Sequence, residues 1–252
     1  MKNIALFTLV LSLLVPAIPA LAQDYMVPES TPAHIRRAVE SESRDESQRA
    51  RDAGRKPAEV MTLAGLSEGD HVAEMSTFGQ YYTPMLVEAV GPTGMVEMYD
   101  LPPLAGFSEG AVGEAGQAFA DAHTNAQYAI VDYNAMEFPA GLDTVYNVLS
   151  YHDFGNFGVD QTAFNAKVFN SLTPGGKYVV IDHLAEDGSG WRDAGTLHRI
   201  GKEAIVDEVT AAGFTVLVDS DILENAEDDR TAVVFQVRGQ TSRAVLVFQK
   251  PM

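Results

Sequence analysis

From Gly69 to the end of the chain, short apolar runs alternate with longer segments whose apolar positions recur at helical spacing. Such runs predict buried strands, and the longer segments predict amphipathic helices that cover them. The runs that predict seven strands are residues 70–75, 94–100, 127–133, 142–154, 177–185, 215–223 and 243–250. The segments that predict helices are residues 82–90, 113–123, 160–172 and 201–214. This alternation predicts an α/β fold, a doubly wound and mostly parallel sheet with helices on both faces.

Residues 23–60 have a different pattern, polar and rich in charge, and they concentrate basic side chains in a very acidic chain. Thr31 and Pro32 are a capping residue and a first-turn proline, which predict that a helix begins there. Pro57 opens a further helical segment. We expect residues 23–60 to form an N-terminal helical extension that docks on an α/β domain of residues 61–252, rather than a free linker.

The first 22 residues have the pattern of a cleavable signal peptide. A basic start at Lys2 precedes an uncharged apolar run over residues 4–15, and Ala20-Leu21-Ala22 is a small-x-small cleavage site. The run is shorter than the ~20 residues of a membrane span. We therefore expect cleavage after Ala22 and a periplasmic or secreted protein, in preference to a buried N-terminal helix.

The formal net charge of −18 limits the classes of partner that the chain is expected to bind. Such a surface repels phosphate backbones, so nucleic acid is not an expected partner, and no later apolar run is long enough for a membrane span. The chain has no cysteine, which excludes disulfides and thiol chemistry. We expect a small molecule as the partner.

In sheets of this kind, ligands bind beyond the carboxyl ends of the strands. The predicted strands and the loop after the fifth bring polar and aromatic residues to that edge. These are Glu74, Asp100, Asp132, Tyr151, His152, Asp153, Asp182, His183, Trp191, Arg192, Thr196, His198 and Arg199. Three of the six histidines lie on this one edge, which is the strongest positional signal in the sequence.

Several stretches then resemble the class I S-adenosylmethionine-dependent methyltransferases, and more closely an exported branch of predicted methyltransferases. The matching stretches are "RDAGRKPAEVM", "AEMSTFGQYYTPML", "VGPTGMV", "NVLSYHDF", "LTPGGKYVVIDH", "GTLHRI" and "DILENAEDDRT". The similarity covers about residues 33 to 250. It implies a seven-stranded Rossmann-like sheet whose last strand is antiparallel and lies between strands five and six.

The resemblance also implies S-adenosylmethionine as the cofactor. By position, Glu74 and Gly79 would hold its methionine part, Asp100 the ribose hydroxyls, and Asp132 would stand beside the adenine. The glycine-rich turn of the family is reduced here to one glycine, because Phe78 and Gln80 flank Gly79. Glycine in such a turn permits positive φ and close approach of the backbone to the ligand. The turn has therefore either rearranged and still binds, or it is plugged.

His152 with Asp153, and His183 on the next strand, are the candidates for catalysis, as a general base or a substrate anchor. The alternative is that each histidine is hydrogen-bonded to its own loop. If the predicted fourth and fifth strands are neighbours, His152 and His183 leave the same edge and lie within roughly 12 Å of each other. We expect these residues, His198 and Glu74 to line one pocket.

Tyr82, Tyr151, Trp191 and His198 are the candidates for substrate contact, the aromatic rings as pocket walls and His198 on a loop that folds back as a lid. No HxH or HExxH spacing supports a metal site, so no metal is expected. A metal-dependent hydrolase would need the three edge histidines to converge. The leading hypothesis is methyl transfer from S-adenosylmethionine to a small molecule. The second hypothesis is a non-catalytic small-molecule binding protein that retains the fold.

Overall fold

The computed structural model describes residues 25–252, so the predicted signal peptide lies outside the described residues. The strands are β1 (His71–Met75), β2 (Met95–Asp100), β3 (Ala126–Ile130), β4 (Leu142–Val148), β5 (Leu172–His183), β6 (Thr215–Ser220) and β7 (Arg243–Gln249). The first helices are α1 (Ala33–Glu40), α2 (Glu46–Arg49), α3 (Asp52–Arg55), α4 (Pro57–Ala64) and α5 (Thr83–Val90). The later ones are α6 (Pro102–Ala105), α7 (Ala111–Ala122), α8 (Gln161–Ser171), α9 (Ala194–Leu197) and α10 (Lys202–Ala211), with 3-10 turns η1 (Phe107–Gly110) and η2 (Tyr151–Asp153).

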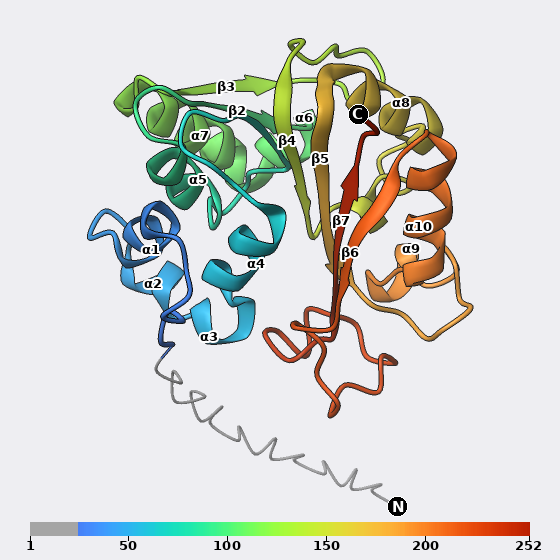
Figure 1. Cartoon of the computed structure of the whole chain (residues 1–252). Helices are drawn as coiled ribbons and strands as arrows, with labels where there is room; N and C mark the ends of the chain where they lie inside the picture. The colour runs from blue at the N-terminus through green and yellow to red at the C-terminus, as the bar shows by residue number, and fades with distance from the viewer. Residues whose placement is uncertain (1–24) are drawn as a thin grey trace, which may run out of the picture.

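The strands form one seven-stranded sheet in the order β3-β2-β1-β4-β5-β7-β6 (Figure 1). β7 is antiparallel to both of its neighbours, β5 and β6, and the other pairings are parallel. The predicted α/β class and the antiparallel last strand between the fifth and sixth strands are therefore confirmed. β1 lies between β2 and β4, so the order of the strands changes direction there, and in such sheets ligands bind at this switch point.

Alternate side chains of the strands enter two hydrophobic cores, one on each face of the sheet. Val72 of β1 packs in the core that contains α1, α4 and α5, whereas its neighbour Ala73 packs in the core that contains α8 and α10. Both residues are fully buried. The apolar strand pattern predicted in the sequence thus results from burial on both faces.

Residues at the ends of α4 and α8 determine where these helices begin and end. α4 begins at Pro57 and ends before Gly65, which takes the left-handed conformation with φ 65°. α8 begins after Asp160, whose side chain accepts a hydrogen bond from the Ala163 N–H. The Asp160 side chain satisfies a backbone N–H that the start of the helix leaves unpaired. Gly65 permits a turn that a residue with a Cβ would strain.

Several predicted strands differ in their bounds, and the fourth and sixth are too long at their carboxyl ends. The fourth was expected to run to Phe154, but β4 ends at Val148 because Leu149 has φ 56° and residues 151–153 form η2. The sixth ends at Ser220, ahead of its expected end at Leu223. In both places the chain turns at the carboxyl edge, and this turn moves the following side chains off the sheet plane.

The N-terminal extension docks on the domain through buried and specific contacts. Arg44 and Asp52 form a buried ion pair at 2.6 Å, and the Tyr81 hydroxyl donates to Asp52 at 2.7 Å. Gln48 donates a hydrogen bond to the Gln80 carbonyl at 2.9 Å. α2 and α3 therefore hold the turn that follows β1.

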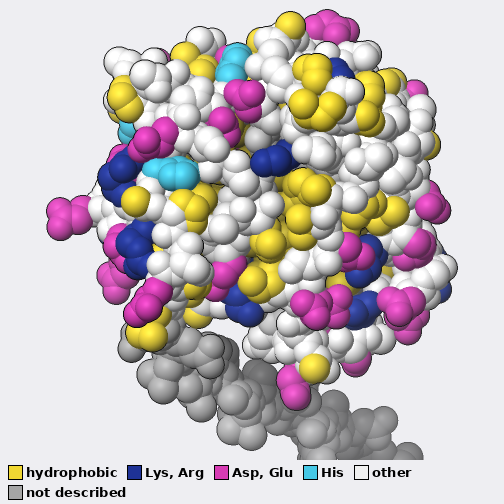
Figure 2. All heavy atoms as spheres, in the orientation of Figure 1, with side chains coloured by type: hydrophobic (Ala, Val, Ile, Leu, Met, Phe, Trp, Pro, Cys, Tyr) yellow, Lys and Arg dark blue, Asp and Glu magenta, His cyan; other side chains and the backbone are white. Residues whose placement is uncertain are grey.

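Acidic side chains are spread over the face drawn in Figure 2, with lysine and arginine side chains among them. Within residues 25–252, no helix has the length and apolar character needed to cross a membrane.

Candidate functional site

The carboxyl ends of β1, β2, β4 and β5 meet at one edge of the sheet. The connection from β6 to β7, residues 221–242, lies at the same edge (Figure 1). Three histidines from different elements converge there. The ring centroid of His152 is 6.0 Å from that of His183 and 5.5 Å from that of His198. The predicted proximity of His152 and His183 is thus confirmed.

His152 lies between two carboxylates. Its Nδ1–H donates to Asp182 at 2.6 Å, and its Nε2 lies 3.3 Å from Asp153. The Asp182 carboxylate also accepts the backbone N–H groups of His152 and His183, each at 2.7 Å. Although burial alone would lower it, the pKa of His152 is raised to about 10 by Asp182 and Asp153. At neutral pH this imidazole is a cation with both nitrogens engaged, so it is an anchor and not a free base.

The other two histidines have different surroundings. Burial, followed by the nearby charges of His152 and Arg243, keeps the pKa of His183 well below its ordinary value. Its Nδ1 is hydrogen-bonded to the Thr241 hydroxyl at 2.9 Å. His198, in the left-handed conformation after α9, contacts Asp153 at 3.0 Å through Nδ1 and packs edge-on against Phe235. His183 is therefore an uncharged imidazole at neutral pH.

Tyr151 and Trp191 stack on one another next to this cluster, with ring centroids 5.9 Å apart. Both are tied to Glu208 of α10, because the Tyr151 hydroxyl donates at 2.8 Å and the Trp191 indole N–H at 2.6 Å. Tyr151 is fully buried and Trp191 partly so. The pair is a fixed aromatic wall that Glu208 orients.

Asp100, at the end of β2, lies next to the turn that follows β1. Its carboxylate accepts hydrogen bonds from the Thr77 hydroxyl at 3.3 Å, the Phe78 N–H at 3.2 Å and the Tyr128 hydroxyl at 3.0 Å. Burial raises the pKa of Asp100, and these three hydrogen bonds oppose that shift. The residue is positioned as the resemblance predicts, and the chain itself supplies its donors.

The turn after β1 retains left-handed backbone without the family's glycines. Gly79 has φ 78°, and the non-glycine residues Ser76 and Gln80 have φ 56° and 41°. Tyr133 links the turn to β2. Its buried hydroxyl accepts a hydrogen bond from the Ser76 N–H at 3.0 Å and donates one to the Tyr99 carbonyl at 3.0 Å. Phe78 is 44% exposed and packs on Phe107. Its side chain is therefore part of the surface.

Glu74 does not join the histidines. It is buried beneath α5, where its carboxyl accepts a hydrogen bond from Thr83 at 2.7 Å. Within residues 25–252 it makes no hydrogen bond to the histidine cluster. Burial raises the pKa of Glu74 to about 8, so the carboxyl is largely uncharged at neutral pH. The expectation that Glu74 shares the histidine pocket is not supported by these contacts.

Asp132 is exposed, and its carboxylate accepts the Asn134 N–H at 2.9 Å. The predicted third strand extended to residue 133, but β3 ends at Ile130, so Asp132 belongs to the following turn. Its position beside a bound adenine stays a prediction.

Tyr82 lines a narrow gap between the extension and the sheet that is too small to hold a water molecule. Arg55 and Arg243 lie on its wall, with apolar side chains from β4, β5 and the β6–β7 connection. Tyr82 is buried and stacks on Tyr146. In this shape the gap has no room for a ligand, and contact of Tyr82 with a substrate stays a prediction.

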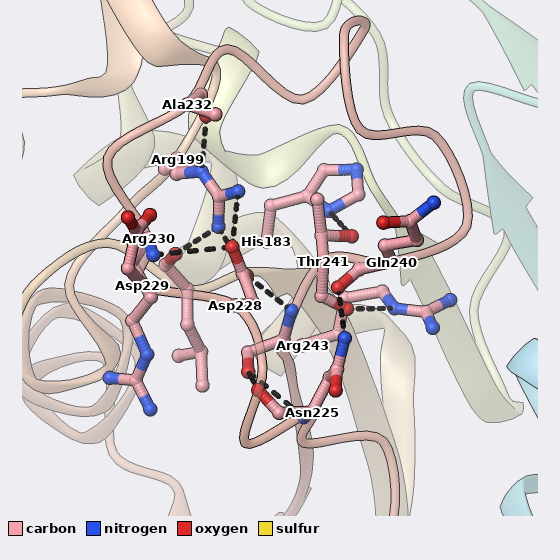
Figure 3. Close-up of polar contacts among 12 residues, drawn as sticks. His183, Arg199, Asn225, Asp228, Asp229, Arg230, Ala232, Gln240, Thr241 and Arg243 are labelled. Carbon is pink, nitrogen blue, oxygen red and sulfur yellow. Dashed lines mark hydrogen bonds and ion pairs between the residues drawn. The ribbon is translucent and has the colours of Figure 1, made fainter.

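The sequence did not reveal what holds the β6–β7 connection in place. Arg199 reaches Asp228 (Figure 3), and its two hydrogen bonds to the carboxylate are 2.8 and 2.9 Å long. The Ser242 N–H donates to the same carboxylate at 2.6 Å. Arg199 is fully buried, and the Asp228 side chain is only 5% exposed although it lies in an acidic stretch of the chain. The charge of Asp228 is neutralised by a partner 29 residues away in sequence. We call Arg199, Asp228 and Ser242 the clasp.

No family model and no curated protein matches this sequence. Solved structures match it in fold. One is a methyltransferase dependent on S-adenosylmethionine from Aquifex aeolicus, at 16% identity and TM-score 0.54, covering 76% of this chain and 87% of that one. Another is fibrillarin from Aeropyrum pernix with natively bound S-adenosyl-L-methionine, at 15% identity and TM-score 0.53, covering 79% and 76%. A third is the [4+2]-cyclase SpnF, at 17% identity and TM-score 0.57, covering 84% and 85%.

Proposed function

We propose, because this chain has the fold of the class I S-adenosylmethionine-dependent methyltransferases, that it binds S-adenosylmethionine beside Asp100 and methylates a small molecule held near His152. The similarity to solved structures concerns the fold. Function has to be argued from the site, since one fold carries many chemistries.

The observation that carries the proposal is the environment of Asp100. A carboxylate that is 1% exposed accepts three hydrogen bonds from neutral donors, two of them long, at 3.2 and 3.3 Å. Ribose hydroxyls are donors of the same kind and can replace Thr77 and Phe78 without leaving the carboxylate unpaired. Arg55 and Arg243 line the closed gap beside Tyr82, and their guanidinium groups would suit the carboxylate of the methionine part if that gap opened on binding. Glu74 has no such role at neutral pH, because it is largely uncharged.

When bound, S-adenosylmethionine supplies an electrophilic methyl group. The chain's own residues then position the acceptor and take its proton. The charged His152, fixed by Asp182, holds Asp153 and orients a polar substrate next to the Tyr151–Trp191 wall. His183 is the proposed acceptor of the proton that the substrate's nucleophile loses, and it is a weak base because burial lowers its pKa.

Calorimetry of the untagged protein with S-adenosylmethionine tests this directly. We expect 1:1 binding. The affinity for S-adenosylmethionine should be about tenfold or more lower in Asp100→Ala, since a hydrogen-bonded charged group contributes ~1.5–3 kcal/mol. Asp121→Ala, an exposed aspartate on α7, is the matched control and should bind as the wild type does. Binding that is absent, or equal in both variants, would overturn the proposal. Asp132→Ala separately tests the predicted adenine contact.

The glycine-poor turn provides a second test. Replacing Phe78 and Gln80 together by glycine should strengthen cofactor binding, because Gln80 has φ 41° and non-glycine residues lose ~1–2 kcal/mol there. Unchanged or weaker affinity would show that Phe78 is a wall of some other site.

One observation favours the second candidate, a non-catalytic small-molecule binding protein. The turn is closed by its own chain, through Tyr133 on Ser76, Gln48 on the Gln80 carbonyl and Tyr81 on Asp52. If S-adenosylmethionine does not bind and the glycine variant does not restore binding, this candidate replaces the first.

We also propose that the protein is exported, with cleavage after Ala22. The apolar run and the small-x-small site support this. Mass spectrometry of the protein from the periplasm or medium should show Gln23 as the first residue, and an intact Met1 there would contradict it.

The net charge of −18 supports a small molecule rather than nucleic acid as the partner.

A further inference from the structure

Three potential metal ligands meet at the end of β4. His152, Asp153 and His198 each offer one ligand atom, and these atoms all lie within 4.8 Å of one another. Two of the residues come from η2 and the third comes from the turn after α9, so the fold brings them together although no short motif does. Two imidazoles and one carboxylate form a ligand set used for divalent transition metals.

The distances suit a shared ion. His152 Nε2 lies 3.3 Å from one oxygen of Asp153, and His198 Nδ1 lies 3.0 Å from the other. Ligands at about 2.1 Å from an ion lie about 3.4 Å apart in a tetrahedron and about 3.0 Å apart in an octahedron. The three ligand atoms, one from each residue, lie within 4.8 Å of one another, so side-chain movements of about 1 Å would bring them to bonding distance of one ion.

A second layer of contacts already orients these ligands. The Nδ1–H of His152 donates to Asp182 at 2.6 Å, so a bound ion would replace the proton on Nε2, the nitrogen that faces Asp153. Asn156 donates to the Asp153 carboxylate at 2.9 Å. A carboxylate behind a ligating histidine is the usual outer partner of protein zinc sites.

The charges also favour a cation. Within residues 25–252, neither Asp153 nor Asp182 pairs with a lysine or arginine, and their ion-pair partners are histidines. The site is also reachable, because the side chains of Asp153 and His198 are 21% and 27% exposed while that of His152 is 3% exposed. Three protein ligands leave at least one coordination position open on that exposed side.

We propose that His152, Asp153 and His198 bind one divalent transition-metal ion of the zinc type, with Asp182 as the positioning residue behind His152. This inference goes beyond the proposed methyl transfer and does not depend on it. An ion there would hold a substrate's oxygen or nitrogen in its open position.

The test uses untagged protein stripped with a chelator and dialysed. Zn²⁺ affinity is measured by competition with a chromophoric indicator, and Co²⁺ absorption reports the ligand set. We expect one ion per chain, with nitrogen and oxygen ligation. His198→Ala and Asp153→Ala should each weaken binding by about 100-fold or more, and Asp182→Asn by roughly 10- to 100-fold. Mg²⁺, which prefers oxygen ligands, should not compete.

His71→Ala is the matched control, because His71 also pairs with a carboxylate, Glu97, at 3.0 Å but lacks a third ligand. It should bind Zn²⁺ as the wild type does. Circular dichroism checks that each variant is folded, and Asp153→Asn replaces Asp153→Ala if the latter is not. Absence of 1:1 binding at micromolar Zn²⁺, or equal affinity in the site variants and the control, would overturn the proposal and leave an ion-pair network.

Discussion

Asp100 at the end of β2 and Asp182 at the end of β5 are buried carboxylates at the same edge of the sheet, but their partners differ. Asp100 accepts hydrogen bonds from neutral groups at 3.0, 3.2 and 3.3 Å. Asp182 accepts one from His152 Nδ1 at 2.6 Å and two from backbone N–H groups at 2.7 Å. A ligand can replace the donors around Asp100. Asp182 is a rigid support for the histidines beside it.

The largest effect should come from the clasp, on the Asp182 side of the edge. Arg199→Met leaves Asp228 as an unpaired buried charge, so we expect the free energy of unfolding to fall by about 3–5 kcal/mol. Lys202→Met, which breaks the exposed pair with Asp219, should cost less than ~1 kcal/mol. Urea denaturation measures both, and similar losses would show that the clasp does not hold the edge together.

The next prediction compares the two carboxylates directly. Asp182→Asn places an amide NH₂ against an N–H donor and should lower the free energy of unfolding by about 2–3 kcal/mol. Asp100→Asn, whose partners include hydroxyls that can reverse their role, should lower it by ~1 kcal/mol. Equal losses would remove the distinction between a replaceable and a rigid carboxylate.

Two tyrosines test whether the turn beside Asp100 is held closed. Tyr133→Phe removes a hydroxyl with two partners, so we expect a loss of about 1–2 kcal/mol. Tyr146→Phe is the same chemical change at a buried hydroxyl with no hydrogen-bond partner among the described residues, and it should be neutral or stabilising. Thermal unfolding of the two variants would contradict this if Tyr146→Phe lost as much stability.

The last effect concerns Glu74 and, unlike the others, depends on pH. Burial raises its pKa from 4.5 to about 8, so its contribution to stability is fully present below pH 4.5 and is lost as the pH rises toward 8. Glu74→Gln stays uncharged. Its stability relative to the wild type should therefore increase by on the order of 1 kcal/mol per pH unit between those values. Glu137→Gln, at an exposed glutamate, is the control, and parallel pH profiles for wild type and Glu74→Gln would contradict the prediction.

Much of the fold could be predicted because strands buried on both faces leave an unmistakable apolar run. The meeting of His152 and His183 could also be predicted, since it follows from β4 and β5 being neighbours. The hydrogen bond between Glu74 and Thr83 could not be predicted, because it depends on how α5 lies over β1. The clasp left no local signal either, since Arg199 and Asp228 meet only when two loops fold at one edge.

The position of β7 has a consequence for the order of synthesis. The chain is made from its N-terminus, so β5 and β6 exist before the strand that lies between them. Until residues Arg243–Gln249 emerge from the ribosome, the sheet can contain only five adjacent strands, and β6 has no native neighbour. A stop codon just before Arg243 would therefore remove two strands from the sheet rather than one. We expect such a truncated chain to be degraded, because β5 would keep an unpaired edge and β6 would be left without a partner.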